Sequence, residues 1–142
     1  MHALLDVNVL IALIDPAHKF HRTARAWASA HAASGWASCP LTQNGCIRII
    51  SQPGYAQPAP ILEAIQTLQT LCQSPLHQFW PDDLSLLDAQ AFDHSKIHGH
   101  RQLTDLYLLA LAVKHQGCFV TFDGAIALSA VKGAKKQHLV VL

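Results

Sequence analysis

Residues 2–11 read HALLDVNVLI, a short apolar run that ends at an acid and then continues with helical spacing. This pattern predicts a buried strand that finishes at Asp6 and a helix that starts at Val7. A second apolar run of the same kind, residues 118–122, ends at Asp123. Because the carboxyl ends of parallel strands meet at one crevice, acids that are far apart in the chain can share a site there.

Strand and helix patterns alternate along the chain, which predicts an α/β fold with a mostly parallel central sheet covered by helices. Further strands are expected at residues 36–39, 76–80 and 137–142. Helices are expected at residues 7–14, 23–34, 40–51, 61–72, 84–92 and 104–115, where proline and glycine residues supply most of the stops. A length of 142 residues suits one domain, so we expect a single domain over residues 1–142.

The composition is apolar for a soluble protein, with 51% hydrophobic and 13% charged residues. No apolar run reaches the length of about 18 residues that a membrane helix needs, and no export signal is visible. We therefore expect a cytoplasmic protein with apolar surface to spare for a partner. The net charge of +1 gives no global field for nucleic acid, so attraction to phosphate must be local or come through bound cations.

A third acid, Asp105, lies in the stretch QLTDLYLL, where we expect the first turn of a helix capped by Thr104. Three carboxylates about 5 Å apart would repel one another by roughly 3 kcal/mol per pair at an effective dielectric near 20. Either a proton or a divalent cation must compensate for this repulsion. Hard carboxylate oxygens favour Mg²⁺ or Mn²⁺, and such an ion can activate a water for attack on a phosphodiester.

The cysteines and histidines are less informative about metal binding. The cysteines are spaced widely and irregularly, which is typical of buried thiols rather than of a zinc site; they are Cys39, Cys46, Cys72 and Cys118. One tight group of histidines precedes Asp105 and fits an exposed loop better than a zinc or catalytic site, because Gly99 interrupts any helix there; it contains His94, His98 and His100.

Four stretches of the chain together resemble the PIN-domain ribonucleases and, among them, the VapC toxins of bacterial toxin–antitoxin pairs. They are LLDVNVLIA at residues 4–12, CPLTQNG at residues 39–45 followed by Arg48, GHRQLTD at residues 99–105, and TFD at residues 121–123. Each is weak alone, but their order and spacing are fairly specific and cover almost the whole chain.

The resemblance implies a three-layer α/β/α PIN-like domain that cleaves RNA with Mg²⁺ or Mn²⁺, through a metal-activated water, leaving a 3′-hydroxyl and a 5′-phosphate. It also implies a homodimer and a cognate antitoxin protein that covers the site. Asp6, Asp105 and Asp123 match the acidic metal-binding positions. Asn8 and Thr121 match polar supporting positions, suited to hydrogen bonding with a carboxylate or a metal-bound water.

Gln43 departs from the family pattern, because PIN domains commonly have a glutamate there. An amide keeps a carbonyl oxygen but has no charge, so we expect a less strained empty site and one well-held ion, with a second recruited only by substrate phosphate. In this interpretation Gln43 orients water or metal. The Gln43→Glu substitution is then expected to tighten Mn²⁺ binding.

Two other functions stay open. The missing acid at Gln43 fits a catalytically weak or silent PIN-like module that binds RNA or protein. A phosphoacceptor signalling domain is disfavoured, because Asp6 has no acidic neighbour.

Other side chains have both a functional and a structural interpretation. Arg48 and Arg101, with the lysines between Lys132 and Lys136, suit phosphate contacts or a solvated surface. The apolar stripe of the helix at residues 61–72 suits the core or an antitoxin groove; its members are Ile61, Ile65 and Leu68. The tryptophans are expected to be packing residues rather than base-stacking ones; they are Trp27, Trp36 and Trp80.

Overall fold

The computed structural model describes residues 1–142 and contains one five-stranded sheet in the order β3-β2-β1-β4-β5. All four strand pairs are parallel, so the predicted mostly parallel sheet is confirmed. The strands are β1 Ala3–Leu5, β2 Trp36–Ser38, β3 His77–Phe79, β4 Cys118–Thr121 and β5 Leu139–Val141. Since β1 lies between β2 and β4, the ends of the two strands that precede acids are neighbours in the sheet.

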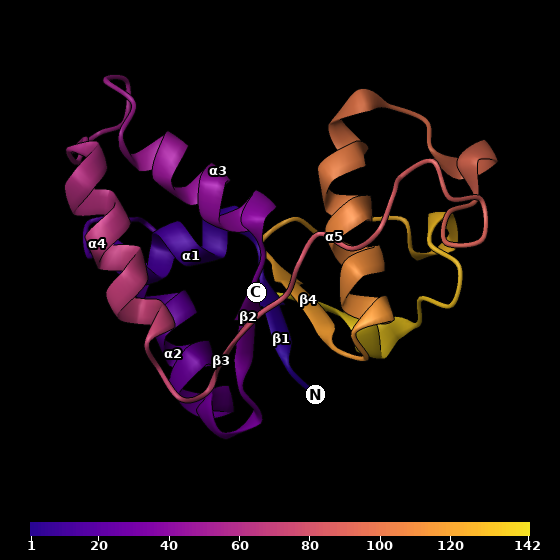
Figure 1. The fold of residues 1–142 in the computed structure, drawn as a ribbon, viewed down its shortest axis with the longest axis horizontal. Coiled ribbons are helices and arrows are strands. Elements are labelled where there is room, and N and C mark those ends of the chain that lie inside the picture. The colour runs from indigo at the N-terminus through magenta and orange to yellow at the C-terminus, as the bar shows by residue number, and fades with distance from the viewer.

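Helices cover both faces of the sheet and complete three α/β/α layers (Figure 1). Four helices lie on one side, and α5 lies on the other with the loops that follow β3 and β4. They are α1 Val7–Ile14, α2 His21–His31, α3 Pro40–Ile50, α4 Ile61–Cys72 and α5 Leu103–Lys114.

Strand alternation assigns each buried side chain to one of two cores. On the α5 side, Leu4, Ala37 and Phe119 pack with the buried leucines of the helix. On the other side, Leu5 and Val120 pack against α1, α3 and α4. Successive residues of a strand point to opposite faces of the sheet. The same alternation therefore determines the layer toward which each polar residue at a strand end points.

Short connections keep the strand ends in register. Gly35 has φ +78°, a left-handed conformation that ends the α2 segment before β2. A Cβ at Gly117 would lie 2.5 Å from the backbone oxygen of His2, so only glycine permits this approach of β4 to the start of β1. Pro40 occupies the first turn of α3, where its missing N–H has no helical partner to lose.

Two local predictions are wrong. Residues 84–92 form turns rather than a helix, because the Ser85 hydroxyl and the Asp88 carboxylate accept hydrogen bonds from backbone N–H groups two residues ahead. Thr104 does not cap α5, which begins at Leu103 directly after a 3-10 turn at His100–Gln102. A minor difference is that α2 begins at His21 and continues after His31 as the 3-10 turn Ala32–Ser34.

The expectation of buried thiols holds for three of the four cysteines. The cysteines are free thiols, of which Cys39, Cys46 and Cys118 are buried and Cys72 is partly buried. None of the helices combines the length and the apolar character that a membrane crossing requires.

Candidate functional site

Asp6 and Asp123 are joined through one buried threonine at the carboxyl edge of the sheet. The backbone N–H of Asp6 donates to the oxygen of Val120 at 2.9 Å, which extends the pairing of β1 with β4 up to the acid. The Thr121 hydroxyl donates to Asp6 Oδ2 at 2.7 Å and accepts from the Asp123 N–H at 3.1 Å. Thr121 is fully buried, so this bridge has one fixed geometry.

The Asp6 carboxylate is also the N-cap of α1, since its Oδ1 accepts from the Val7 N–H at 2.7 Å. Each oxygen therefore keeps one free lone-pair direction. Burial raises the pKa of Asp6, and the nearby charge of Asp123 adds to the rise, while the hydrogen bonds from Thr121 and Val7 oppose it. The ionised carboxylate is thus strained electrostatically in spite of good hydrogen bonding.

Asp105 brings the third carboxylate to the same place from the first turn of α5. The pKa of Asp105 is raised to about 6, first by burial and then by the charges of Asp6 and Asp123 and by a hydrogen bond with Asp123. A cavity beside Asp105 and Asp123 has a volume of about 210 Å³ and is also lined by Arg101 and by residues 125–127. The three predicted acids are therefore close enough for their charges to interact, although Asp6 does not line this cavity.

The donor set fits a hard divalent cation in chemistry, because it consists of carboxylates whose mutual repulsion a cation would relieve. No three His, Cys, Asp or Glu side chains lie close enough to form a ready-made cage around an ion. Any ion bound here must therefore complete its shell with water or substrate oxygens, which is common for Mg²⁺.

Asn8 and Gln43 make no hydrogen bond with these carboxylates. Asn8 is exposed in the first turn of α1. Gln43 lies in the first turns of α3, and its Nε2 donates to the Ser38 hydroxyl at 2.9 Å. Ser38 follows Ala37, which faces α5, so Ser38 and the amide of Gln43 lie in the opposite layer.

Ser38 connects Gln43 to a histidine that the sequence did not single out. The Ser38 hydroxyl is fully buried and lies 2.8 Å from His77 Nε2. Burial lowers the pKa of His77, while the backbone of Cys72 opposes this change. A neutral ring whose Nε2 accepts the Ser38 proton leaves the Ser38 oxygen free to accept from Gln43. The only sequence signal for this group was a serine at a strand end just before the helix that contains Gln43.

Comparison with known proteins identifies the family. The PIN domain family matches residues 3–132. The chain belongs to the PIN-domain family. It is 53% identical to Ribonuclease VapC44 of Mycobacterium tuberculosis over 142 residues, which is 100% of both chains. It is 43% identical to Ribonuclease VapC39 of the same organism over 135 residues, covering 94% of this chain and 96% of the relative. These identities place it among the VapC proteins.

A solved structure supports the same fold. This PIN domain matches the crystal structure of VapBC2 from Rickettsia felis bound to a DNA fragment from their promoter, with a TM-score of 0.57. The match covers 87% of this chain and 88% of the other at 12% sequence identity, so it supports the fold alone.

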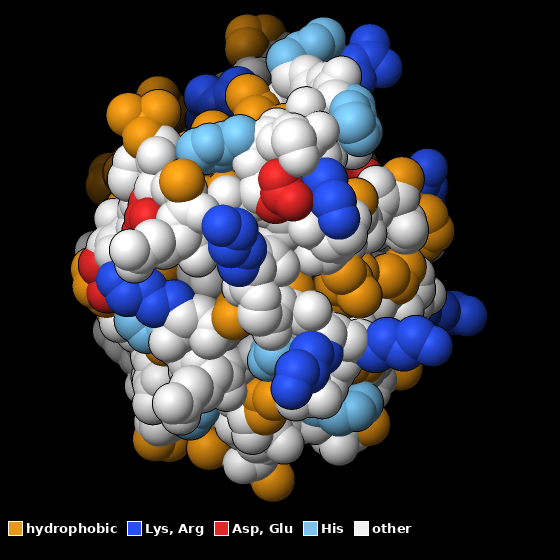
Figure 2. Space-filling view, turned by 90° about the vertical axis from the view of Figure 1, so that its right-hand side faces the viewer, with side chains coloured by type: hydrophobic (Ala, Val, Ile, Leu, Met, Phe, Trp, Pro, Cys, Tyr) orange, Lys and Arg blue, Asp and Glu red, His pale blue; other side chains and the backbone are white.

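Charge is distributed unevenly along the PIN domain. Residues 94–142 hold six Lys and Arg residues against two acids, Asp105 and Asp123, which gives +4. Residues 1–93 hold four against seven acids, which gives −3. On the side of the molecule covered by α5 and the neighbouring loops, blue Lys and Arg side chains outnumber red acids (Figure 2). This asymmetry favours a polyanion on the α5 side of the acidic site.

Arg48 and the histidines that precede Asp105 make no hydrogen bond or salt bridge with the three carboxylates. Arg48 is exposed in the last turn of α3. His94, His98 and His100 are exposed, and the ring of His94 is 2.8 Å from the oxygen of Leu86. Each tryptophan stacks on or tilts against a histidine, as expected for packing residues; the pairs are Trp27–His31, Trp36–His77 and Trp80–His115.

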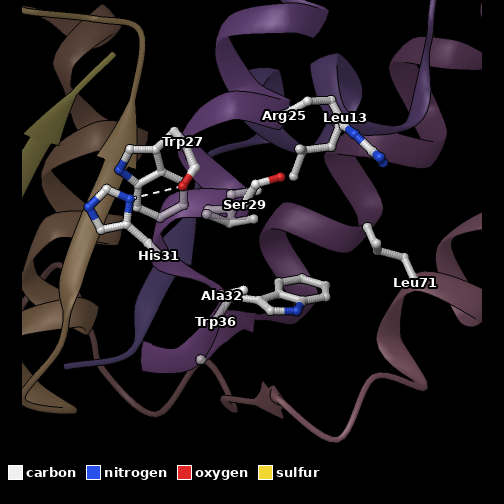
Figure 3. A pocket seen from close by; sticks show the side chains of 11 residues that line it. Leu13, Arg25, Trp27, Ser29, His31, Ala32, Trp36 and Leu71 are labelled. Carbon is white, nitrogen blue, oxygen red and sulfur yellow. Dashed lines mark hydrogen bonds between the residues drawn. The ribbon is translucent and has the colours of Figure 1, made fainter.

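A second cavity of the PIN domain is apolar and contains no carboxylate (Figure 3). It has a volume of about 280 Å³ and lies among α1, α2, α4 and the start of β2. Trp27 stacks on His31 at one side, and Leu13, Arg25 and Leu71 also line the cavity. The absence of acidic ligands makes this cavity unsuited to a divalent cation and suited to an apolar partner segment.

Proposed function

We propose that this PIN domain is a VapC-type toxin, a metal-dependent endoribonuclease that hydrolyses RNA phosphodiester bonds and is neutralised by a cognate antitoxin. The observation that carries the proposal is the electrostatic interaction among Asp6, Asp105 and Asp123, which contributes to the raised pKa of both Asp6 and Asp105. Titratable groups perturbed in this way, beside a cavity, are typical of functional sites.

Asp6, Asp105 and Asp123 would hold Mg²⁺ or Mn²⁺. When bound, the cation supplies charge neutralisation on the phosphate and activation of a water. Thr121 fixes the Asp6 carboxylate by donating to Oδ2 and fixes the Asp123 backbone by accepting its N–H. Asp105 is mostly ionised at pH 7 and takes up a proton near pH 6. The expected products carry a 3′-hydroxyl and a 5′-phosphate.

Asn8 and Gln43 have different parts in this proposal. Asn8 is exposed on the first turn of α1, next to the cap formed by Asp6, where it is accessible to substrate or to a hydrated ion. Gln43 acts indirectly, since its hydrogen bond to Ser38 ties the first turns of α3 to the end of β2. Three carboxylates, rather than four acids, then make up the charge of the site.

The antitoxin would contact the α4 side of the molecule. Ile61 and Leu62 of α4 are 62% and 66% exposed, whereas Leu68 of the same predicted stripe is buried. The apolar cavity reaches Leu71, one turn beyond Leu68 on α4. This apolar surface would be covered in the complex. A homodimer in the cytoplasm is part of the same proposal and follows from the family.

Growth and cleavage assays test the function together. Induction of the wild-type chain should arrest growth, and Asp105→Ala should relieve the arrest. The purified protein should cleave RNA in Mg²⁺ or Mn²⁺ and not with a chelator, and Asp6→Asn should abolish cleavage. Asp88→Asn is the matched control, because Asp88 is an exposed acid in a surface turn. If the wild type binds RNA but shows no metal-dependent cleavage, the silent binding module is correct.

A further inference from the structure

Two phenylalanines stack beside the acidic site and belong to neither the catalytic set nor the fully buried core. The rings of Phe20 and Phe122 lie 4.7 Å apart with an interplanar angle of 27°. Phe122 stands in the chain between Thr121 and Asp123, so it is fixed next to the carboxylates. Phe20 comes from the connection between α1 and α2, which the fold brings to the end of β4.

The Phe20 ring is only partly buried. It is 37% exposed, whereas Phe92 and Phe119 in the core are 1% and 0% exposed. An aromatic ring left partly in water next to a functional site offers an open surface to a ligand. The absence of Phe20 from the buried core also means that its substitution need not unfold the protein.

Basic side chains accompany the pair. Lys19 Nζ lies over the Phe20 ring, 4.9 Å from its centroid, and the centroid of the His18 ring lies 5.9 Å from that of Phe20. A base that stacks on Phe20 would therefore displace the Lys19 side chain toward its phosphate. The connection is ordered by local hydrogen bonds, from the Ala17 N–H to Asp15 Oδ1 at 2.9 Å and from the Phe20 N–H to His18 Nδ1 at 3.1 Å. An aromatic surface with a cation beside it matches a nucleotide, whose base stacks and whose phosphate is negative.

The pair and the basic side of the molecule lie on opposite sides of the carboxylates. Phe122 follows Thr121 and packs in the α1 layer with Val120, whereas Asp105 and Arg101 come from the α5 layer. An RNA strand that crosses the carboxylates would therefore meet the Phe20–Phe122 pair on one side and Arg101 on the other.

We propose that Phe20 and Phe122 form a stacking platform for one unpaired base of the RNA, next to the phosphate that is cleaved. This inference rests on the proposed ribonuclease function and adds to it the pair of residues that would position a base beside the cleaved phosphate. A paired base cannot leave its helix to stack here without the cost of unpairing. Stacking on phenylalanine also tolerates every base, so the platform selects strandedness rather than sequence.

A binding experiment with a fluorescent base tests the platform. The Asp105→Asn protein, in which cleavage is blocked, is titrated into a short single-stranded RNA with one 2-aminopurine at successive positions. Stacking should quench the fluorescence at one position. Phe20→Leu keeps an apolar side chain but removes the ring, so it should weaken binding roughly tenfold and abolish that quenching. Phe20→Trp should restore both.

Controls separate the platform from general effects. Phe79→Leu removes a phenylalanine that is 54% exposed on β3 and stacks on no other ring, so it should leave affinity and quenching unchanged. The same RNA annealed to its complement should bind Phe20→Leu and the parent protein alike. Thermal unfolding of each variant shows that the fold is kept.

The outcomes are distinct. If the parent protein binds no RNA, the proposed function fails. If it binds RNA but Phe20→Leu keeps both the affinity and the quenching, the platform is refuted and the proposed function stands. If Phe20→Leu weakens binding of the antitoxin and not of RNA, the pair belongs to a protein interface and the inference is likewise overturned.

Discussion

Asp105 should make the metal-free protein less stable as the pH rises. Its folded pKa of about 6 lies above the ordinary value of 3.8, so the folded chain holds this proton more tightly than the unfolded chain. The stabilising contribution is therefore complete below pH 3.8 and is lost as the pH rises through about 6. Asp105→Asn removes the titration and should make the metal-free protein more stable than the wild type at pH 7.5.

The size of the effect follows from the change in pKa. A rise from 3.8 to about 6 corresponds to about 3 kcal/mol if the group were fully shielded from water. Because Asp105 is only half-buried, solvent screening reduces this to about 1 kcal/mol. For a chain of this size that is a difference of roughly 3 °C in Tm.

Urea unfolding in a chelator at pH 5 and pH 7.5 measures the effect for the wild type and Asp105→Asn. The difference between the two proteins is needed because His77, whose pKa is lowered, changes stability in the opposite direction through the same pH range. Mn²⁺ at pH 7.5 should stabilise the wild type and have little effect on Asp105→Asn. An equal stability of both proteins at pH 7.5 without metal would refute the proposed crowding of the carboxylates.

Three further outcomes are expected. Thr121→Val should lower the free energy of unfolding in urea by about 1–3 kcal/mol, because it leaves a buried oxygen of Asp6 without its hydrogen-bond donor. The same substitution should weaken Mn²⁺ binding roughly tenfold in calorimetry. Gln43→Glu should leave the Mn²⁺ affinity unchanged and should raise the pKa of His77, which NMR can follow. The new carboxylate would accept the Ser38 proton, so the His77 ring would have to donate a proton to Ser38 instead of accepting one. Tighter Mn²⁺ binding would instead support the expectation from the sequence that Gln43 lies in the metal site. Arg101→Gln should reduce the slope of log affinity for single-stranded RNA against log salt by about 0.7, whereas Arg22→Gln on α2 should not change it.

The strand ends were predictable from the sequence because they depend on local patterns. The apolar run before Asp6 and the one before Asp123 each fix a buried parallel strand. The turn at residues 84–92 was not predictable in the same way, since its apolar residues fit a helix. This segment forms turns instead, because the side chains of Ser85 and Asp88 accept backbone hydrogen bonds and Phe92 forms a β-bridge with Val131.

The surroundings of Gln43 show what the sequence leaves open. Gln43 lies at the start of the helix that follows β2, and this position suggested a place among the acids. However, successive residues of a strand face opposite sides of the sheet, and Gln43 is bound to a residue on the side away from α5. Ser38 points into the α4 layer and holds the amide there.

The sequence by itself determined that strands end shortly before Asp6 and Asp123 and that Asp105 lies at the start of a helix, because hydrophobic periodicity and stop residues act over a few neighbours. Only the tertiary structure decided that Thr121 joins two of these acids, that Ser38 links Gln43 to His77, and that Phe20 stacks on Phe122. Such contacts link residues from separate elements, so they depend on strand order, register and layer, which no local pattern specifies.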